Sequence, residues 1–144
     1  MSNLIQHVKT GGKFENIYRY SRLIHIGDWI MSSGTAGRNY VTREISPVVA
    51  QQVHQAMKNI SSALKALNAT VSDIVQIRIF IATQDDLPEV LETLATYFEG
   101  TDPVHAIHCG PLPGGAEVKI ELEVTCYKPT SSEVKREWLV TQPE

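Results

Sequence analysis

The chain has 144 residues, of which 42% are hydrophobic and 20% charged, a composition typical of a single globular domain. Its 13 basic and 16 acidic side chains give a formal charge of -3, so no net positive charge draws it to nucleic acid or to an anionic membrane. The amino-terminal residues lack the pattern of a signal peptide, and two cysteines, expected to be buried, cannot form a disulfide framework, so a cytoplasmic location is expected.

The first predicted elements form a β-hairpin. Residues 20–26 and 29–33 are rich in β-prone side chains, and a glycine-aspartate pair between them supplies the tight turn. An additional strand is considered near residues 5–9. Glycines and an asparagine in residues 34–39 then predict a loop, where the chain leaves the sheet.

A long amphipathic helix is predicted to begin near Ser46-Pro47 and to end at Asn68. Serine is a favourable N-cap, and proline fits the first helical turn because its missing N–H is not needed there. Apolar residues recur at steps of three and four along this segment: Val49, Val53, Ala56, Met57, Ile60, Leu64 and Leu67.

The second half of the chain is predicted to contain three strands and one more helix. The strands cover 74–82, 104–109 and 117–127, and in the last one apolar and polar residues alternate. A helix lies between the first two strands, beginning near Asp85 and stopped by Gly100.

The resulting order, β-β-α-β-α-β-β, predicts an α+β domain of two layers. Two amphipathic helices on one face of a mixed sheet bury both helix stripes and the apolar face of the sheet. We expect this single domain to cover residues 1–128. Residues 129–144 form a polar tail with one apolar cluster, Trp138-Leu139-Val140.

The sequence contains no P-loop, GxGxxG, HExxH or GxSxG motif, so nothing supports a nucleotide-dependent enzyme, a zincin or an α/β-hydrolase. His105, His108 and Cys109 are residue types that bind zinc. On a strand, however, residues 105 and 108 point to opposite faces, so no metal site is expected. Arg78, in a mostly apolar strand, is expected to pair with a carboxylate.

Several segments are similar, in order and spacing, to those of a known family. They are Tyr20-Ser21-Arg22, Ile26-Gly27-Asp28, Ser32-Ser33-Gly34-Thr35, Asp73-Ile74-Val75, Asp102-Pro103-Val104-His105, Leu112-Pro113 and Val118-Lys119-Ile120-Glu121. Over residues 15–128 the chain resembles the Rid (reactive intermediate deaminase) family, also called YjgF or L-PSP endoribonuclease-like proteins. The resemblance implies a chorismate-mutase-like homotrimer that binds small molecules at its subunit interfaces.

The resemblance also implies an activity that needs no cofactor. Enamines and imines, such as 2-aminoacrylate, are hydrolysed to a 2-keto acid and ammonia. Water attacks the imine carbon in this reaction, while an arginine holds the substrate carboxylate through two parallel hydrogen bonds.

Four residues are carried over as substrate-binding, and no catalytic residue is assigned. Tyr20 matches the tyrosine of the family pocket, and Ser33 matches the serine before a strand-ending glycine. His105 stands where the family has its substrate-binding arginine, and Lys119 replaces the second residue of a Val-Glu-Ile-Glu strand. Because histidine cannot form the two-pronged grip, we expect substrates other than the usual 2-imino acids. Lys119 is expected to supply the missing charge, since positions 105 and 119 are expected to share one face of the sheet.

Other interpretations stay open. Without the resemblance, Tyr20 is an ordinary strand aromatic, His105 a packed histidine and Lys119 part of a solvated charged row. Loss of the arginine also fits a non-catalytic trimer that binds or senses a small metabolite. A ribonuclease activity, which one family name suggests, is disfavoured by the net negative charge and by the lack of a basic, aromatic-rich patch.

Overall fold

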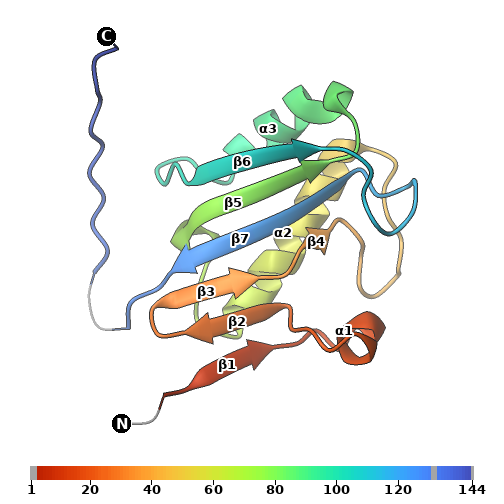
Figure 1. The fold of residues 1–144 in the computed structure, drawn as a ribbon, viewed down its shortest axis with the longest axis horizontal. Helices are drawn as coiled ribbons and strands as arrows, with labels where there is room; N and C mark the ends of the chain where they lie inside the picture. The colour runs from red at the N-terminus through yellow and green to blue at the C-terminus, as the bar shows by residue number, and fades with distance from the viewer. Residues whose placement is uncertain (1–2, 131–132, 144) are drawn as a thin grey trace.

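The computed structural model describes residues 3–130 and 133–143 of the chain. Within these residues the chain forms one mixed sheet, two longer helices behind it and a short helix at one end (Figure 1). The elements in chain order are β1 (Ile5–Val8), α1 (Lys13–Ile17), β2 (Leu23–Ile26), β3 (Trp29–Ser32), β4 (Thr35–Ala36), α2 (Val49–Lys65), the 3-10 turn η1 (Val71–Asp73), β5 (Ile74–Ile81), the 3-10 turn η2 (Gln84–Asp86), α3 (Leu87–Ala95), β6 (Val104–Cys109) and β7 (Ile120–Tyr127).

The strands follow the order β1-β2-β3-β7-β5-β6, and the short β4 also pairs with β7. Every neighbouring pair is antiparallel except β5 and β6, which run parallel and are connected through α3. This topology places β7, the last strand of the sequence, in the middle of the sheet. It leaves β1 and β6 as the two edges (Figure 1).

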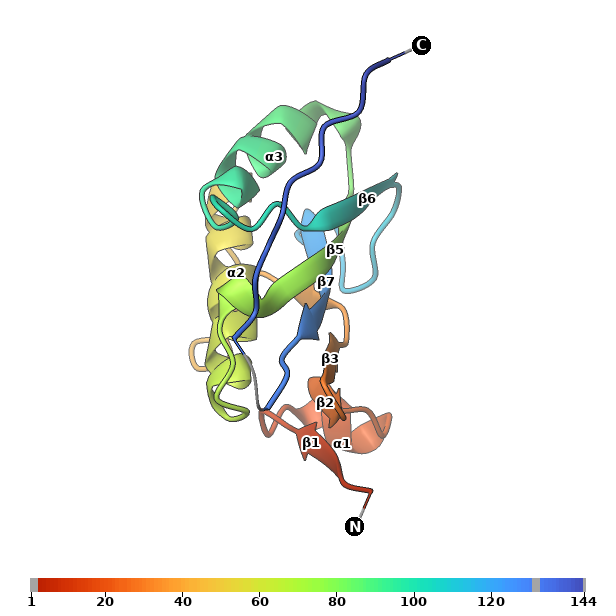
Figure 2. The same cartoon turned by 90° about the vertical axis from the view of Figure 1, so that its left-hand side faces the viewer.

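Helices α2 and α3 cover one face of the sheet and leave the other face open (Figure 2). The core lies between these layers, where the buried residues of β7 (Ile120, Leu122, Val124 and Cys126) alternate with polar ones. The alternation confirms the pattern predicted for the last strand, and the layers confirm the two-layer α+β fold. No helix among the described residues is long and apolar enough to cross a bilayer.

The predicted hairpin and the predicted strands near residues 74–82 and 104–109 are confirmed, but the long helix begins later than predicted. Its first residue is Val49, because Val48 is extended, with φ of -90° and ψ of 120°, and stands at the N-cap in place of Ser46. The Ser46 hydroxyl still accepts a hydrogen bond from the backbone N–H of Val48 at 3.1 Å. The helix ends at Lys65, and Asn68, with φ of 55°, completes the turn that follows.

Two elements were not predicted from the sequence. Helix α1 has five residues, too few to show a helical period, and strand β4 has only two. The expectation that both cysteines are buried is also wrong for Cys109, which is exposed. It lies on β6, whose side chains are all exposed because the strand is an edge of the sheet.

The carboxy-terminal tail, where described, has no regular secondary structure and runs along the side of the molecule on which β6 begins (Figures 1 and 2). Two hydrogen bonds connect it to the domain. The Arg136 guanidinium donates to the Ser72 carbonyl at 2.9 Å, and the Trp138 indole donates to the Asp102 carboxylate at 2.8 Å.

Candidate functional site

A cavity of about 650 Å³ lies at one end of the sheet, where α1, β4 and the loop that enters β7 come together (Figure 1). These segments are far apart in the sequence, so only the fold assembles the cavity. The residues that line it are mostly aromatic or charged: Thr10, Gly12, Lys13, Phe14, Glu15, Tyr18, Tyr20, Arg22, Gly34, Ala36, Arg38, Tyr40, Arg43, Pro113, Gly114, Val118 and Glu121.

A buried ion pair lies at the base of this cavity. Glu15 of α1 is 1% exposed and Arg22, just before β2, is 6% exposed, with 3.4 Å between the guanidinium and the carboxylate. Glu15 also accepts hydrogen bonds from the backbone N–H and the hydroxyl of Thr10. The pair therefore anchors α1 to the strand and fixes one wall of the cavity.

Arg22 also connects this wall to β4. Its guanidinium donates to the Gly34 carbonyl at 2.7 Å and to the Thr35 hydroxyl at 3.1 Å. The same group lies 5.7 Å from the ring centre of Tyr20 and 5.9 Å from that of Tyr40, within the range of cation–π contacts. Burial raises the pKa of the Tyr40 hydroxyl, so Tyr40 stays a neutral hydrogen-bonding group.

Glu121 of β7 brings a carboxyl group into the cavity. Burial raises the pKa of this carboxyl above its ordinary value and the charge of Glu123 raises it further, while the positive charge of Arg22 opposes both. The side chain lies against Gly34, and a Cβ atom at position 34 would collide with its carboxylate. The glycine thus leaves space for an acid whose environment suits proton transfer.

Basic side chains form the rim of the cavity. Arg38 donates to Glu117 at 2.8 Å in a partly exposed ion pair. Lys13 and Arg43 take part in no ion pair within residues 3–130 and 133–143. Positive charge that is not neutralised by a neighbour favours a negatively charged ligand at this rim.

Two of the four residues predicted to bind substrate lie at this cavity or directly beside it. Tyr20 lines it. Ser33 adjoins the lining residue Gly34, and its hydroxyl donates to the Ser21 carbonyl at 2.6 Å. The Ser33 backbone N–H also donates to the Arg22 carbonyl at 3.0 Å, so Ser33 holds together the two segments that carry Tyr20 and Arg22.

His105 and Lys119 are not brought together within one copy of the chain. His105 pairs with Ile77 on β5, whereas the Lys119 carbonyl accepts from the backbone N–H of Ala82. Five residues along β5 correspond to about 16 Å, and the odd separation puts the two side chains on opposite faces of the sheet. The prediction that positions 105 and 119 share a face is therefore wrong. The parallel register of β5 with β6, which directs His105 toward the helices, is the reason.

Sequence reasoning did not assign two charged residues of the cavity, Glu121 and Arg22, to the site. Glu121 is named from the sequence only within a segment of the family resemblance, whereas in the structure its carboxylate fits because a glycine lies against it. Arg22 lies in a segment that predicts a strand and forms part of the family resemblance, but its partner Glu15 lies on a helix that was not predicted. The sequence does not show that Arg22 pairs with Glu15 or that Glu121 enters a cavity, because these contacts are tertiary.

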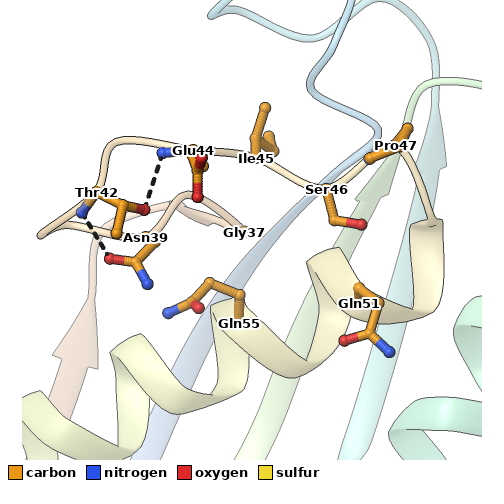
Figure 3. A pocket seen from close by; sticks show the side chains of 9 residues that line it. All are labelled: Gly37, Asn39, Thr42, Glu44, Ile45, Ser46, Pro47, Gln51 and Gln55. Atoms are coloured by element: carbon orange, nitrogen blue, oxygen red, sulfur yellow. Dashed lines mark hydrogen bonds between the residues drawn. The ribbon is translucent and has the colours of Figure 1, made fainter.

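A second cavity, of about 470 Å³, lies between the loop after β4 and the first turns of α2 (Figure 3). Its lining is mainly amides, hydroxyls and backbone. Asn39 accepts hydrogen bonds from the backbone N–H groups of Val41 and Thr42, and so shapes the loop itself. The Asn59 amide of α2 donates to the Ala36 and Arg38 carbonyls at 3.3 and 2.9 Å and so holds this segment against the helix, while Tyr40 of the same loop lines the first cavity.

The histidines of β6 point in opposite directions, as the strand geometry predicts. His105 lines a hollow beneath α3, whereas the His108 ring stacks on Phe80, with ring centres 5.4 Å apart. In the part of the chain that the structure describes, no three His, Cys, Asp or Glu side chains are grouped as metal ligands would be. Arg78, expected to pair with a carboxylate, contacts Glu123 at 3.0 Å.

Comparison with known proteins identifies this arrangement. The family model for endoribonuclease L-PSP matches residues 10–128. The 2-iminobutanoate/2-iminopropanoate deaminase of Mus musculus is 31% identical over 124 residues, which is 84% of this chain and 92% of that protein. The protein of that name from Dermatophagoides farinae is 29% identical over 104 residues, 71% of this chain and 81% of its own.

Solved structures agree with these sequence matches. Rv2704 from Mycobacterium tuberculosis, of the YjgF/YER057c/UK114 family, has a TM-score of 0.78 and 27% identity, covering 86% of this chain and 99% of its own. The YjgF gene product of E. coli has a TM-score of 0.68 and 28% identity, and the match covers 75% of this chain and 87% of the E. coli chain. With its α+β chorismate-mutase-like fold, this chain therefore belongs to the Rid family, also known as the YjgF or L-PSP family.

Proposed function

We propose that this protein is a hydrolytic deaminase that converts a small imine or enamine into a carbonyl compound and ammonia. The observation that carries the proposal is the carboxyl of Glu121, whose pKa burial raises, in a cavity with Tyr20 and a basic rim. The names of the mouse and mite relatives, 2-iminobutanoate/2-iminopropanoate deaminases, support the same reaction class.

The reaction requires two proton transfers that a single carboxyl group can relay. In its ionised form Glu121 accepts a proton from water as the oxygen forms a bond to the imine carbon. In its protonated form it returns that proton to the nitrogen. The carbon–nitrogen bond then breaks, the hydroxyl proton moves to the departing nitrogen, and ammonia and a carbonyl group result. We assign Tyr20 to orient the substrate from the wall of the cavity.

The substrate is proposed to differ from the usual 2-imino acids because His105 replaces the family's arginine. Within one copy of the chain the cations at the cavity are Lys13, Arg22, Arg38 and Arg43. Only a guanidinium offers the fork that binds a carboxylate through two bonds, so Arg43, which has no ion pair within the described residues, replaces that function. The carboxylate of the substrate would then lie at the rim.

A homotrimer is part of the proposal. The fully exposed edge strand β6 carries His105 about 16 Å along the sheet from the level of Lys119, so His105 could join a cavity only in a neighbouring copy. We therefore propose that Tyr20, Ser33 and Lys119 of one subunit and His105 of the next surround the ligand at each interface.

The test is a coupled assay in which an amino-acid oxidase generates imines in situ and ammonia release is followed. The parent protein is expected to accelerate hydrolysis of at least one imine over buffer. Glu121→Gln should abolish this acceleration, and Tyr20→Phe should reduce it. Activity should fall as the pH is lowered through the raised pKa of Glu121, because the base must be ionised.

A matched control variant shows whether the loss of activity is specific to the carboxyl group in the cavity. Glu123→Gln removes a neighbouring carboxylate of the same strand, which is paired with Arg78, and should leave most of the turnover. Ligand-induced thermal stabilisation without turnover of any imine would contradict the proposal and favour the non-catalytic binder, the alternative suggested by the loss of the arginine.

A further inference from the structure

The cavity at Glu121 is larger than a three-carbon imino acid requires. Its volume of about 650 Å³ lies within the range of about 300–1,000 Å³ that holds drug-sized ligands. Four of the side chains around it are aromatic, namely Phe14, Tyr18, Tyr20 and Tyr40. A small aliphatic substrate would leave most of this aromatic surface in contact with water.

The aromatic side chains fall into two pairs with different surroundings. The rings of Tyr20 and Tyr40 both lie within 6 Å of the buried Arg22 guanidinium, so each already contacts a cation inside the protein. Phe14 and Tyr18 of α1 stack on each other, with ring centres 5.9 Å apart, yet Phe14 is 51% exposed. The buried Glu15 between them in sequence holds α1 in place, so this second pair forms a fixed, exposed apolar wall.

The charges around the cavity indicate that a ligand should also carry a negatively charged group. Four basic residues line it, against two acidic ones, Glu15 and Glu121, although the chain as a whole carries a charge of -3. Glu15 neutralises Arg22, and Glu117 neutralises Arg38. The charges that remain for a ligand are those of Lys13, whose ammonium lies 6.0 Å from the ring centre of Phe14, and of Arg43, which lines the same cavity.

From this combination we infer that the substrate is an imine or enamine that carries both a carboxylate and an aromatic ring. Its ring would pack on Phe14 and Tyr18, its carboxylate would bind Arg43 and Lys13, and its reacting carbon would face Glu121. Hydrolysis adds one water and releases an aromatic 2-keto acid and ammonia. The inference rests on the proposed function for its chemistry, but its binding part can be measured separately.

The first experiment measures binding by calorimetry with the full chain and three probes. Phenylpyruvate has both features, pyruvate lacks the ring, and 2-phenylethanol lacks the carboxylate. Phenylpyruvate is expected to bind at least tenfold more tightly than either of the others. Equal affinity for phenylpyruvate and pyruvate would overturn the inference, because the aromatic wall would then contribute nothing.

Variants locate the binding site. Phe14→Ala and Arg43→Ala should each weaken phenylpyruvate binding by about three- to tenfold, the range expected for one aromatic contact or one charge-assisted hydrogen bond. The matched controls are Trp138→Ala, whose side chain is 54% exposed on the tail, and Arg136→Ala beside it. Both controls should bind like the parent protein. If Phe14→Ala changes the sedimentation of the protein and not its affinity, a neighbouring copy covers α1 and the inference is wrong.

Turnover distinguishes this inference from the proposed function. Tight binding of phenylpyruvate without hydrolysis of the imine of phenylalanine supports the ligand class and contradicts the enzyme. Hydrolysis of 2-iminopropanoate at least as fast as that of the phenylalanine imine supports the enzyme and overturns the ligand class.

Discussion

Glu121 has opposite effects on stability and on the proposed reaction. The half-buried carboxyl has a raised pKa, so the folded state binds a proton more tightly than the unfolded chain does. As the pH rises through this pKa, the folded state loses stability relative to the unfolded state. A residue that costs stability at neutral pH while it faces a cavity is typical of a functional position.

Replacing Glu121 by glutamine should therefore stabilise the protein while it abolishes turnover. The variant removes the charged form that burial disfavours, so its melting temperature should exceed that of the parent at neutral pH. The difference should vanish below pH 4.5, the ordinary pKa of a glutamate, where both chains are neutral at this position. Thermal unfolding monitored across this pH range tests the sign, and a variant less stable at neutral pH would contradict it.

The Glu15–Arg22 pair is expected to be essential for folding. Removing one partner of a buried ion pair leaves an uncompensated charge, which costs about 3–5 kcal/mol. Glu15→Ala should lower the free energy of unfolding by that amount. Glu117→Ala, which breaks the partly exposed pair with Arg38, should cost no more than about 1 kcal/mol. Urea titration of both variants makes the comparison, and equal losses would show that the buried pair has no special role.

At the scale of the elements, α2 positions the loops at the cavity through one buried side chain. The Gln52 amide donates to the carbonyls of Ser46 and Glu117 at 2.7 and 2.9 Å, and accepts from the Lys119 backbone N–H at 2.9 Å. The same helix passes so close to Gly37 that a Cβ atom there would collide with the helix backbone. Helix α2 thus holds both the loop before it and the entry to β7.

Gln52→Leu is expected to loosen both loops at once. The substitution keeps an apolar surface for packing but leaves two carbonyls and one N–H without their partner, so it should cost about 2 kcal/mol or more. Gln51→Leu, at the exposed preceding position, should change stability by less than about 0.5 kcal/mol. Chemical denaturation gives both values, and hydrogen exchange of the Lys119 amide should accelerate only in the Gln52 variant.

At the scale of the whole molecule, the sheet face opposite the helices is too apolar for a surface in water. Ile26, Trp29 and Met31 lie on it, each more than 40% exposed, and Trp29 contacts Tyr127 with ring centres 5.1 Å apart. Apolar residues grouped in this way mark an interaction surface. The proposed trimer would cover this face with the sheets of two further copies.

Sedimentation tests the assembly directly. The parent protein is expected to sediment with three times its chain mass of 16.0 kDa at micromolar concentration. Met31→Asp places a charge on the apolar face, where it would be buried by the neighbouring sheets, and should shift the protein to a single chain. Val41→Asp, on an exposed loop away from that face, is the control and should leave the assembly unchanged. A parent protein that sediments as one chain would contradict the trimer.

The local sequence pattern was enough to predict the longer helices and strands and their arrangement in two layers. Alternation in β7 and the period of α2 appear in the chain because side chains on a strand or helix face follow fixed repeats. These repeats determined the α+β class and the helix-covered face of the sheet, whereas the family resemblance rests on particular residues and their spacing. The predicted start of α2 was wrong because the extended conformation of Val48 is not encoded in the helical repeat, and the five-residue α1 was too short to show a repeat.

Tyr20 and Ser33 were proposed as substrate-binding from the family resemblance, and their role in binding stays a prediction, with Tyr20 in the cavity lining and Ser33 beside it. Only the tertiary structure decided that Glu121, Arg22 and α1 form the cavity and that His105 and Lys119 lie on opposite faces. Charge pairs across strands depend on register and on the parallel or antiparallel sense of each pair. A local sequence pattern predicts neither the register nor the direction of a strand pair, because the free energy that selects both comes from burying the whole sheet against its helices.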